Sequence, residues 1–221
     1  MTCASPFCHL ILVLALSVGA WLLSRDRTLP TASGAVVMAI GIFALAALQR
    51  IPFPTRLVTQ LIALAMLVVW TYIALHFLAC AVRGTMHRHS GDPIQSFAIG
   101  TWVAGTAVVA ELVLTGVPQW RAVAAALALI AVLLWVWYLA LVARGLWAII
   151  AGRTRGGPNG AILLSTVSTQ SIVILGPLLG PRQVPRAAWA VLVILGYLFY
   201  VTGLMLIVRH YLRERGLRLA D

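Results

Sequence analysis

The sequence predicts an all-α fold, a polytopic bundle of about seven transmembrane helices forming one membrane domain over residues 1–221. Three observations predict it. The chain is 62% hydrophobic and only 10% charged, which leaves no room for a soluble domain. Apolar stretches of about 20 residues recur along it, and a helix of that length crosses a hydrocarbon core of about 30 Å. The breaks between these stretches are short and hold nearly all the arginines.

Seven apolar stretches are expected to span the membrane. In chain order they are residues 7–23, 31–48, 57–82, 94–114, 122–143, 161–179 and 187–208. Prolines in the breaks, among them Pro52, Pro118 and Pro185, end helices, and short breaks force neighbouring helices to run antiparallel. The first stretch is expected to be retained as an additional helix, because its positive charges, Arg25 and Arg27, follow it, the reverse of the layout of a signal peptide.

The arginines predict how the helices are oriented. With the N-terminus outside, the breaks on the inner side hold 11 arginines and those on the outer side hold 5. The positive-inside rule then places the C-terminus in the cytoplasm and the protein, as a multi-pass protein, in the cytoplasmic (inner) membrane. Because the arginines lie at span ends and not on a soluble module, the net charge of +11 does not predict binding of nucleic acid. The expected partner is the lipid bilayer.

The stretches alternate in character. Residues 57–82, 122–143 and 187–208 are bulky, whereas residues 31–48, 94–114 and 161–179 carry glycines and hydroxyls. In lipid, small residues allow backbones to approach closely, and hydroxyls need partners or water. The alternation predicts an outer ring of bulky helices around an inner ring that lines a passage.

Eight residues are the candidates for lining that passage, and they lie on the three small and polar stretches. They are Gly41, Thr101, Gly105, Ser165, Thr166, Ser168, Thr169 and Gln170. Together with Ser171, the last five place six polar side chains in seven positions, more than close packing requires. Two alternatives stay open: hydroxyls bond back to carbonyls of the preceding helical turn, and glycines serve helix packing.

The remaining polar residues predict no cofactor and no metal site. His87 and His89 form a pair in a break, where histidines are expected to be solvated, and no acid or cysteine cluster completes a zinc site. His76 is alone within a span and is expected to be a packed core histidine, since haem between helices usually needs a second axial ligand. Glu111, near the outer end of its span, is expected to snorkel towards the interface.

Three segments resemble the tellurite-resistance/dicarboxylate transporter family, which includes the plant guard-cell slow anion channels. The segments are residues 30–42, 89–106 and 159–176, and the most specific feature is Thr-Gln-Ser at residues 169–171. The resemblance orders residues 31–208 as the first six of the family's roughly ten helices, with residues 7–23 as an extra helix. It implies a passage lined by the odd-numbered family helices, which are the small and polar stretches here.

The function that the resemblance implies is transport of small anions, either C4-dicarboxylates, tellurite-like oxyanions, or halide or nitrate ions, by a channel or transporter that is not an enzyme. Because the family has more helices, the resemblance also implies a homo-oligomer or a partner subunit. Two alternatives stay open: an accessory membrane subunit without transport activity and, ranked lower, a haem- or metal-binding subunit of a membrane oxidoreductase.

Overall fold

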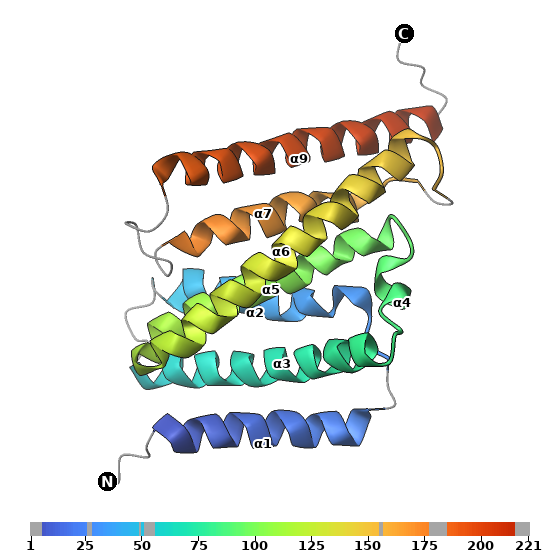
Figure 1. The fold of residues 1–221 in the computed structure, drawn as a ribbon. Coiled ribbons are helices and arrows are strands. Elements are labelled where there is room, and N and C mark those ends of the chain that lie inside the picture. The colour runs from blue at the N-terminus through green and yellow to red at the C-terminus, as the bar shows by residue number, and fades with distance from the viewer. Residues whose placement is uncertain are drawn as a thin grey trace.

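The structure is a computed structural model, and it describes residues 6–25, 28–48, 50, 56–154, 157–176 and 185–214. Among the described residues, seven helices of 11 residues or more lie alongside one another (Figure 1). They are α1 (Pro6–Ser24), α2 (Gly34–Leu48), α3 (Arg56–Val82), α5 (Gly100–Gly116), α6 (Arg121–Ile150), α7 (Leu164–Ile174) and α9 (Arg186–Glu214). Short elements join them: α4 (His87–Ser90) and the 3₁₀ turns η1 (Thr31–Ser33), η2 (Gln95–Ile99), η3 (Pro118–Trp120) and η4 (Gly160–Leu163).

The predicted all-α membrane bundle is confirmed. Four helical segments among the described residues are long and apolar enough to cross a membrane: Leu57–Val82, Gln95–Gly116, Pro118–Ile150 and Arg186–Arg213. Three more apolar helices are shorter: Cys8–Ser24, Thr31–Ala46 and Gly160–Ile174. Together they correspond to the seven stretches expected from the sequence.

Helix α5 lies at the centre of the bundle and packs against α2, α3, α6 and α7. In its most apolar window 83% of the residues are buried, against 11% in the window of α9. Helices α1 and α9 form opposite edges, α1 packing on α3 and α9 on α7 (Figure 1). The expected difference between bulky outer helices and small inner helices is therefore clearest for α5.

Glycines bring α2 and α5 into close contact. A Cβ atom on Gly34 would lie 2.6 Å from the backbone carbonyl carbon and oxygen of Thr101, and one on Gly105 would lie 3.1 Å from the carbonyl oxygen of Gly34. A Cβ atom on Gly41 would collide with the side chain of Val108. These side-chain-free positions let the two backbones approach closely, as small residues do in membrane helices.

Hydroxyl groups attach α1 to α3. The Ser17 hydroxyl, which is fully buried, lies 2.7 Å from the Val13 carbonyl oxygen and 3.2 Å from that of Val68. At the end of α1, the hydroxyls of Ser24 and Tyr72 are 3.0 Å apart. Helix α1 is thus held to α3 at two depths of the bundle.

One end of the bundle collects the starts of α2, α5 and α7 and the ends of α1, α3, α6 and α9 (Figure 1). The arginines that the sequence assigned to the inner side and that the structure describes belong to this end: Arg25, Arg83, Arg88, Arg144, Arg153, Arg209 and Arg213. We call it the arginine-rich end.

Candidate functional site

Three helices begin next to one another at the arginine-rich end, each through a 3₁₀ turn. η1 precedes α2, η2 precedes α5 and η4 precedes α7, and η2 contacts both of the other turns. A proline stands one or two residues before each turn: Pro30, Pro93 and Pro158. Its fixed φ favours the start of a helix and ends the preceding segment. The same local signal therefore places three helix starts side by side.

Side chains cap two of these starts. Asp92 Oδ1 accepts hydrogen bonds from the backbone N–H groups of Ile94 and Gln95, both at 2.8 Å. Asn159 Oδ1 accepts one from the N–H of Ala161 at 3.0 Å. Each cap satisfies donors that a helix start leaves without an intrahelical partner, and so fixes where the helix begins.

The three starts surround a cavity of about 590 Å³, which we call the vestibule. Its walls come from the segment before α2, the end of α3, α4, η2 and the segment before α7. The lining residues are Thr28, Leu29, Pro30, Thr31, Ala32, Cys80, Arg88, His89, Ile94, Gln95, Ala98, Asn159 and Ala161. None of them is acidic, and Arg88 is exposed. The vestibule is therefore a hollow with a mostly apolar wall, one positively charged side chain and no carboxylate among its lining residues.

His89 is buried, and the expectation that it is solvated is wrong. It is 8% exposed, its Nδ1 lies 3.1 Å from the Thr31 hydroxyl, and its ring meets the edges of Phe77 and Trp102. Burial lowers the pKa of His89, and the charge of Arg88 lowers it further. The imidazole is therefore neutral at neutral pH, and Arg88 supplies the vestibule's side-chain charge. His87, by contrast, is exposed, as expected.

Backbone dipoles add to the charge of Arg88. Each helix start carries the equivalent of roughly half a positive charge, which the Asp92 carboxylate partly offsets before α5. Backbone N–H groups that Asp92 and Asn159 do not cap can bind anions. Trp102 Nε1 donates to the Thr31 carbonyl oxygen at 2.6 Å and holds the start of α2 against α5. A positive side chain beside converging helix starts is an arrangement that favours anions over cations.

The predicted passage residues of α2 and α5 lie where these two helices meet. Gly41 and Gly105 occupy the close contact described above, and Thr101 is 1% exposed, its hydroxyl donating to the Ala98 carbonyl oxygen at 2.7 Å. Thr101 and Gly105 also border a second cavity, of about 410 Å³, between α3, α5 and α6.

Four of the five hydroxyls of α7 bond back to their own helical segment. Ser165 Oγ donates to the Ile162 carbonyl oxygen at 2.7 Å, and Ser168 and Thr169 donate to that of Ser165 at 3.0 and 2.8 Å. The Thr169 hydroxyl also accepts from Trp135 Nε1 at 3.2 Å. These three side chains are at most 1% exposed. The back-bonding alternative thus describes their contacts, and none of the α7 residues lines either cavity.

Three other polar groups have different surroundings. Gln170 Nε2 donates to the Val193 carbonyl oxygen of α9 at 3.2 Å, so this side chain joins α7 to α9. The Thr166 hydroxyl is buried and finds no partner among the described residues. In α5, Glu111 is partly exposed, but its Oε2 atom is buried and also lacks a partner among those residues. Snorkelling therefore describes this carboxylate only in part.

Within the described part of the chain, no three His, Cys, Asp or Glu side chains come together as they would around a metal ion. His76 is 5% exposed, lies edge-on to Tyr72 and is 3.4 Å from the Ser24 hydroxyl. It is packed between α3 and α1, as expected of a core histidine.

These features define a helical membrane protein in which three helix starts and Arg88 converge on one cavity. The family model for the voltage-dependent anion channel matches residues 28–211, which begin just before η1 and end within α9. The chain belongs to this family, and membership gives it a role in moving anions across a membrane. No curated protein and no solved structure matches it. The resemblance noted on residues 30–42, 89–106 and 159–176 is thereby confirmed.

Sequence reasoning identified the family but missed the vestibule. From the sequence, Arg88 served only to orient the helices, and His89 was expected to be solvated. Their neighbours in the vestibule, Thr31 and Asn159, are far away in the sequence. The available signal was the proline before each of the three small and polar stretches.

Proposed function

We propose that the protein moves small anions, of the dicarboxylate, tellurite-like oxyanion or halide and nitrate classes, and that they enter through the vestibule. The observation that carries the proposal is the meeting of three helix starts with Arg88 around one cavity that has no acidic lining residue. Backbone N–H groups and hydroxyls replace part of the anion's hydration shell there, and the arginine raises its local concentration.

From the vestibule, the anion follows α2, α5 and α7. Their predicted lining residues are Gly41, Thr101, Gly105, Ser165, Thr166, Ser168, Thr169 and Gln170. Conduction requires α2 or α7 to shift from the packing described above, so that back-bonded hydroxyls such as those of Ser165 and Thr169 turn towards a passage. No covalent step is involved, and the protein acts as a transporter or channel, not as an enzyme.

A second copy or a partner subunit is proposed to complete the wall of the passage. On the outer face of α2, Phe43 is 71% exposed and Val36 53%, so this inner-type helix presents large apolar side chains outwards. The proposed location is the cytoplasmic membrane, with the arginine-rich end inside. A protein that is monomeric in detergent and in vesicles yet supports flux would contradict the need for a partner.

The test is anion flux into proteoliposomes with Arg88→Gln. A unit charge about 5 Å from an anion in a water-filled cavity contributes ~0.8 kcal/mol, or about a fourfold change in local concentration. Flux is expected to fall by about that factor at low ionic strength and to approach the wild-type value at high salt, which screens the charge. The matched control is Arg153→Gln, an exposed arginine at the same end that does not line the vestibule.

Equal flux in Arg88→Gln, Arg153→Gln and wild type at low salt would remove the vestibule from the route. Absence of flux in the wild-type protein for every anion tested would favour the alternative of an accessory subunit without transport activity.

A further inference from the structure

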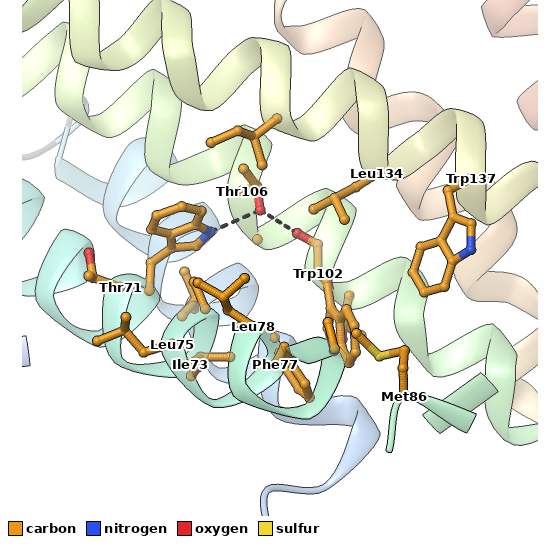
Figure 2. A pocket seen from close by; sticks show the side chains of 18 residues that line it. Thr71, Ile73, Leu75, Phe77, Leu78, Met86, Trp102, Thr106, Leu134 and Trp137 are labelled. Carbon is orange, nitrogen blue, oxygen red and sulfur yellow. Dashed lines mark hydrogen bonds between the residues drawn. The ribbon is translucent and has the colours of Figure 1, made fainter. Parts of the chain in front are cut away.

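The cavity of about 410 Å³ lies on the side of the bundle, between α3 and α6 and over α5 (Figure 2). Both outer helices pack on α5, but α6 crosses it obliquely, so that α3 and α6 diverge towards the arginine-rich end (Figure 1). We call this cavity the lateral groove. Its residues on α3 recur at helical spacing: Trp70, Thr71, Ile73, Ala74, Leu75, Phe77, Leu78 and Ala81.

The walls of the lateral groove are apolar, and the polar groups of Trp70, Thr71 and Thr106 are hydrogen-bonded within the protein. Trp70 Nε1 donates to the Thr106 hydroxyl at 2.9 Å, and that hydroxyl donates to the Trp102 carbonyl oxygen at 2.6 Å (Figure 2). The Thr71 hydroxyl donates to the Leu67 carbonyl oxygen at 2.8 Å. An occupant therefore gains mainly apolar contact, which favours a hydrocarbon over water or an ion.

Aromatic rings fix the shape of the lateral groove. Phe77 of α3 and Trp102 of α5 are stacked with 3.5 Å between ring centroids, and Trp137 of α6 stands opposite them (Figure 2). The Trp102 indole is held in turn by its bond to the Thr31 carbonyl oxygen. Preformed walls reduce the conformational entropy lost when a ligand binds.

The lateral groove opens towards lipid. At its rims Leu78 of α3 is 58% exposed and Ile130 of α6 is 37% exposed, and both belong to segments that are long and apolar enough to span the membrane. From Trp70 to Ala81 the groove follows α3 for ~16 Å, about half of a hydrocarbon core of ~30 Å. Its length therefore matches one leaflet of the bilayer.

The shape and polarity of the lateral groove indicate its occupant. Its volume of about 410 Å³ extends along ~16 Å of α3, and its walls are apolar. A single extended hydrocarbon chain matches this length and polarity.

Arginines stand where the headgroup of such a lipid would lie. Arg83 is exposed and follows Ala81, the last groove residue of α3, by two positions. Arg144 lies two helical turns beyond Trp137 on α6 and donates to the Ser90 carbonyl oxygen of α4. Guanidinium groups at this depth bind phosphate oxygens well.

From these observations we propose that the lateral groove is a binding site for one acyl chain of a phospholipid, taken from the leaflet at the arginine-rich end. The site is distinct from the vestibule and does not depend on whether the protein transports anions.

The test is photolabelling in phosphatidylglycerol–phosphatidylcholine vesicles that contain a phosphatidylglycerol with a diazirine in one acyl chain, followed by mapping of the adducts by mass spectrometry. Adducts are expected on residues 70–81 and 130–137. Ala74→Phe, which fills the groove, is expected to lower this labelling about tenfold, equivalent to ~1.4 kcal/mol of binding. Ala65→Phe makes the same change on the exposed opposite face of α3 and should leave it unchanged.

A second measurement on the wild-type protein is independent of how the variants fold. Labelling of the groove is expected to saturate as the probe fraction rises, while labelling of exposed residues such as Leu61 increases in proportion. Groove labelling that rises in proportion, or that is absent while Leu61 is labelled, overturns the proposal. An equal loss of groove labelling in Ala74→Phe and Ala65→Phe also overturns the proposal.

Discussion

Replacing Gly34 with alanine tests the close contact between α2 and α5. A Cβ atom at this position would lie 2.6 Å from the carbonyl carbon and oxygen of Thr101 and 2.9 Å from its hydroxyl. The φ of Gly34 is −60°, so alanine adopts the backbone conformation without strain and the collision alone decides the outcome. Because the opposing atoms are backbone, no rotamer change relieves it, and the helices must separate.

The distance by which α2 and α5 must separate sets the expected loss of stability. Restoring an ordinary contact of 3.4 Å from 2.6 Å requires α2 and α5 to move apart by 0.8 Å locally. A gap of about 0.5–1 Å forfeits a quarter to a half of the dispersion energy of the atoms facing it, and overpacking typically costs about 1–3 kcal/mol. We expect a loss of ~2–3 kcal/mol, or a melting temperature lower by ~4–12 °C for a chain of this size.

The assay is size-exclusion chromatography of the detergent-solubilised protein after heating, which reports the fraction that remains folded. Gly19→Ala is the matched control, because a Cβ atom on Gly19 of α1 meets nothing within 4 Å. It is expected to raise stability by about 0.5–1 kcal/mol, as alanine does in helices. If Gly34→Ala and Gly19→Ala melt alike, α2 and α5 are farther apart than described and the reasoning is refuted.

Three further predictions concern two buried side chains and the orientation of the chain in the membrane. Tyr138→Phe removes the 2.9 Å hydrogen bond to the buried Phe97 carbonyl oxygen and is expected to cost about 1–3 kcal/mol, seen as a lower melting temperature; unchanged melting would contradict it. Burial and Arg88 lower the pKa of His89 from 6.5, so the folded protein binds fewer protons than the unfolded chain. The contribution of neutral His89 to stability is therefore fully present above pH 6.5 and is lost as the pH falls from there towards the lowered pKa. His89→Gln should flatten this decline when the melting temperature is measured against pH. For orientation, a reporter fused after Asp221 is expected to be active only in the cytoplasm, and periplasmic activity would reverse the assignment.

The helices could be predicted from the sequence because apolar length is a local property. The stretches expected at residues 57–82 and 94–114 correspond to α3 and to η2 with α5 within two residues. The stretch expected at 122–143 is longer in the structure, since α6 continues to Ile150. The predicted stretch stops before Arg144 because that residue is charged. In the structure the Arg144 guanidinium donates to the Ser90 carbonyl oxygen, and the apolar residues after it continue the helix.

The candidate site could be predicted only in part. Hydroxyl content shows that α7 needs hydrogen-bond acceptors, but not whether water or a carbonyl supplies them, and Ser165 and Thr169 find carbonyls. The vestibule depends on residues 31, 88 and 159, which only the packing of three helix starts brings together. Burial of His89 follows from rings on α3 and α5 that no spacing in the sequence relates to it.

The near-complete burial of α5 has a consequence for biosynthesis. Its segment has a mean hydropathy of 1.8, against 2.2 for the segment of α3 and 2.5 for those of α6 and α9. Insertion by the translocon depends on the apolarity of each helix taken alone, whereas in the finished bundle α5 packs against α2, α3, α6 and α7 and borders lipid at the lateral groove. This segment is long and apolar enough to cross a membrane but is the least hydrophobic of the four, so a truncation ending between α5 and α6 should weaken its insertion more than a truncation after α3 weakens that of α3.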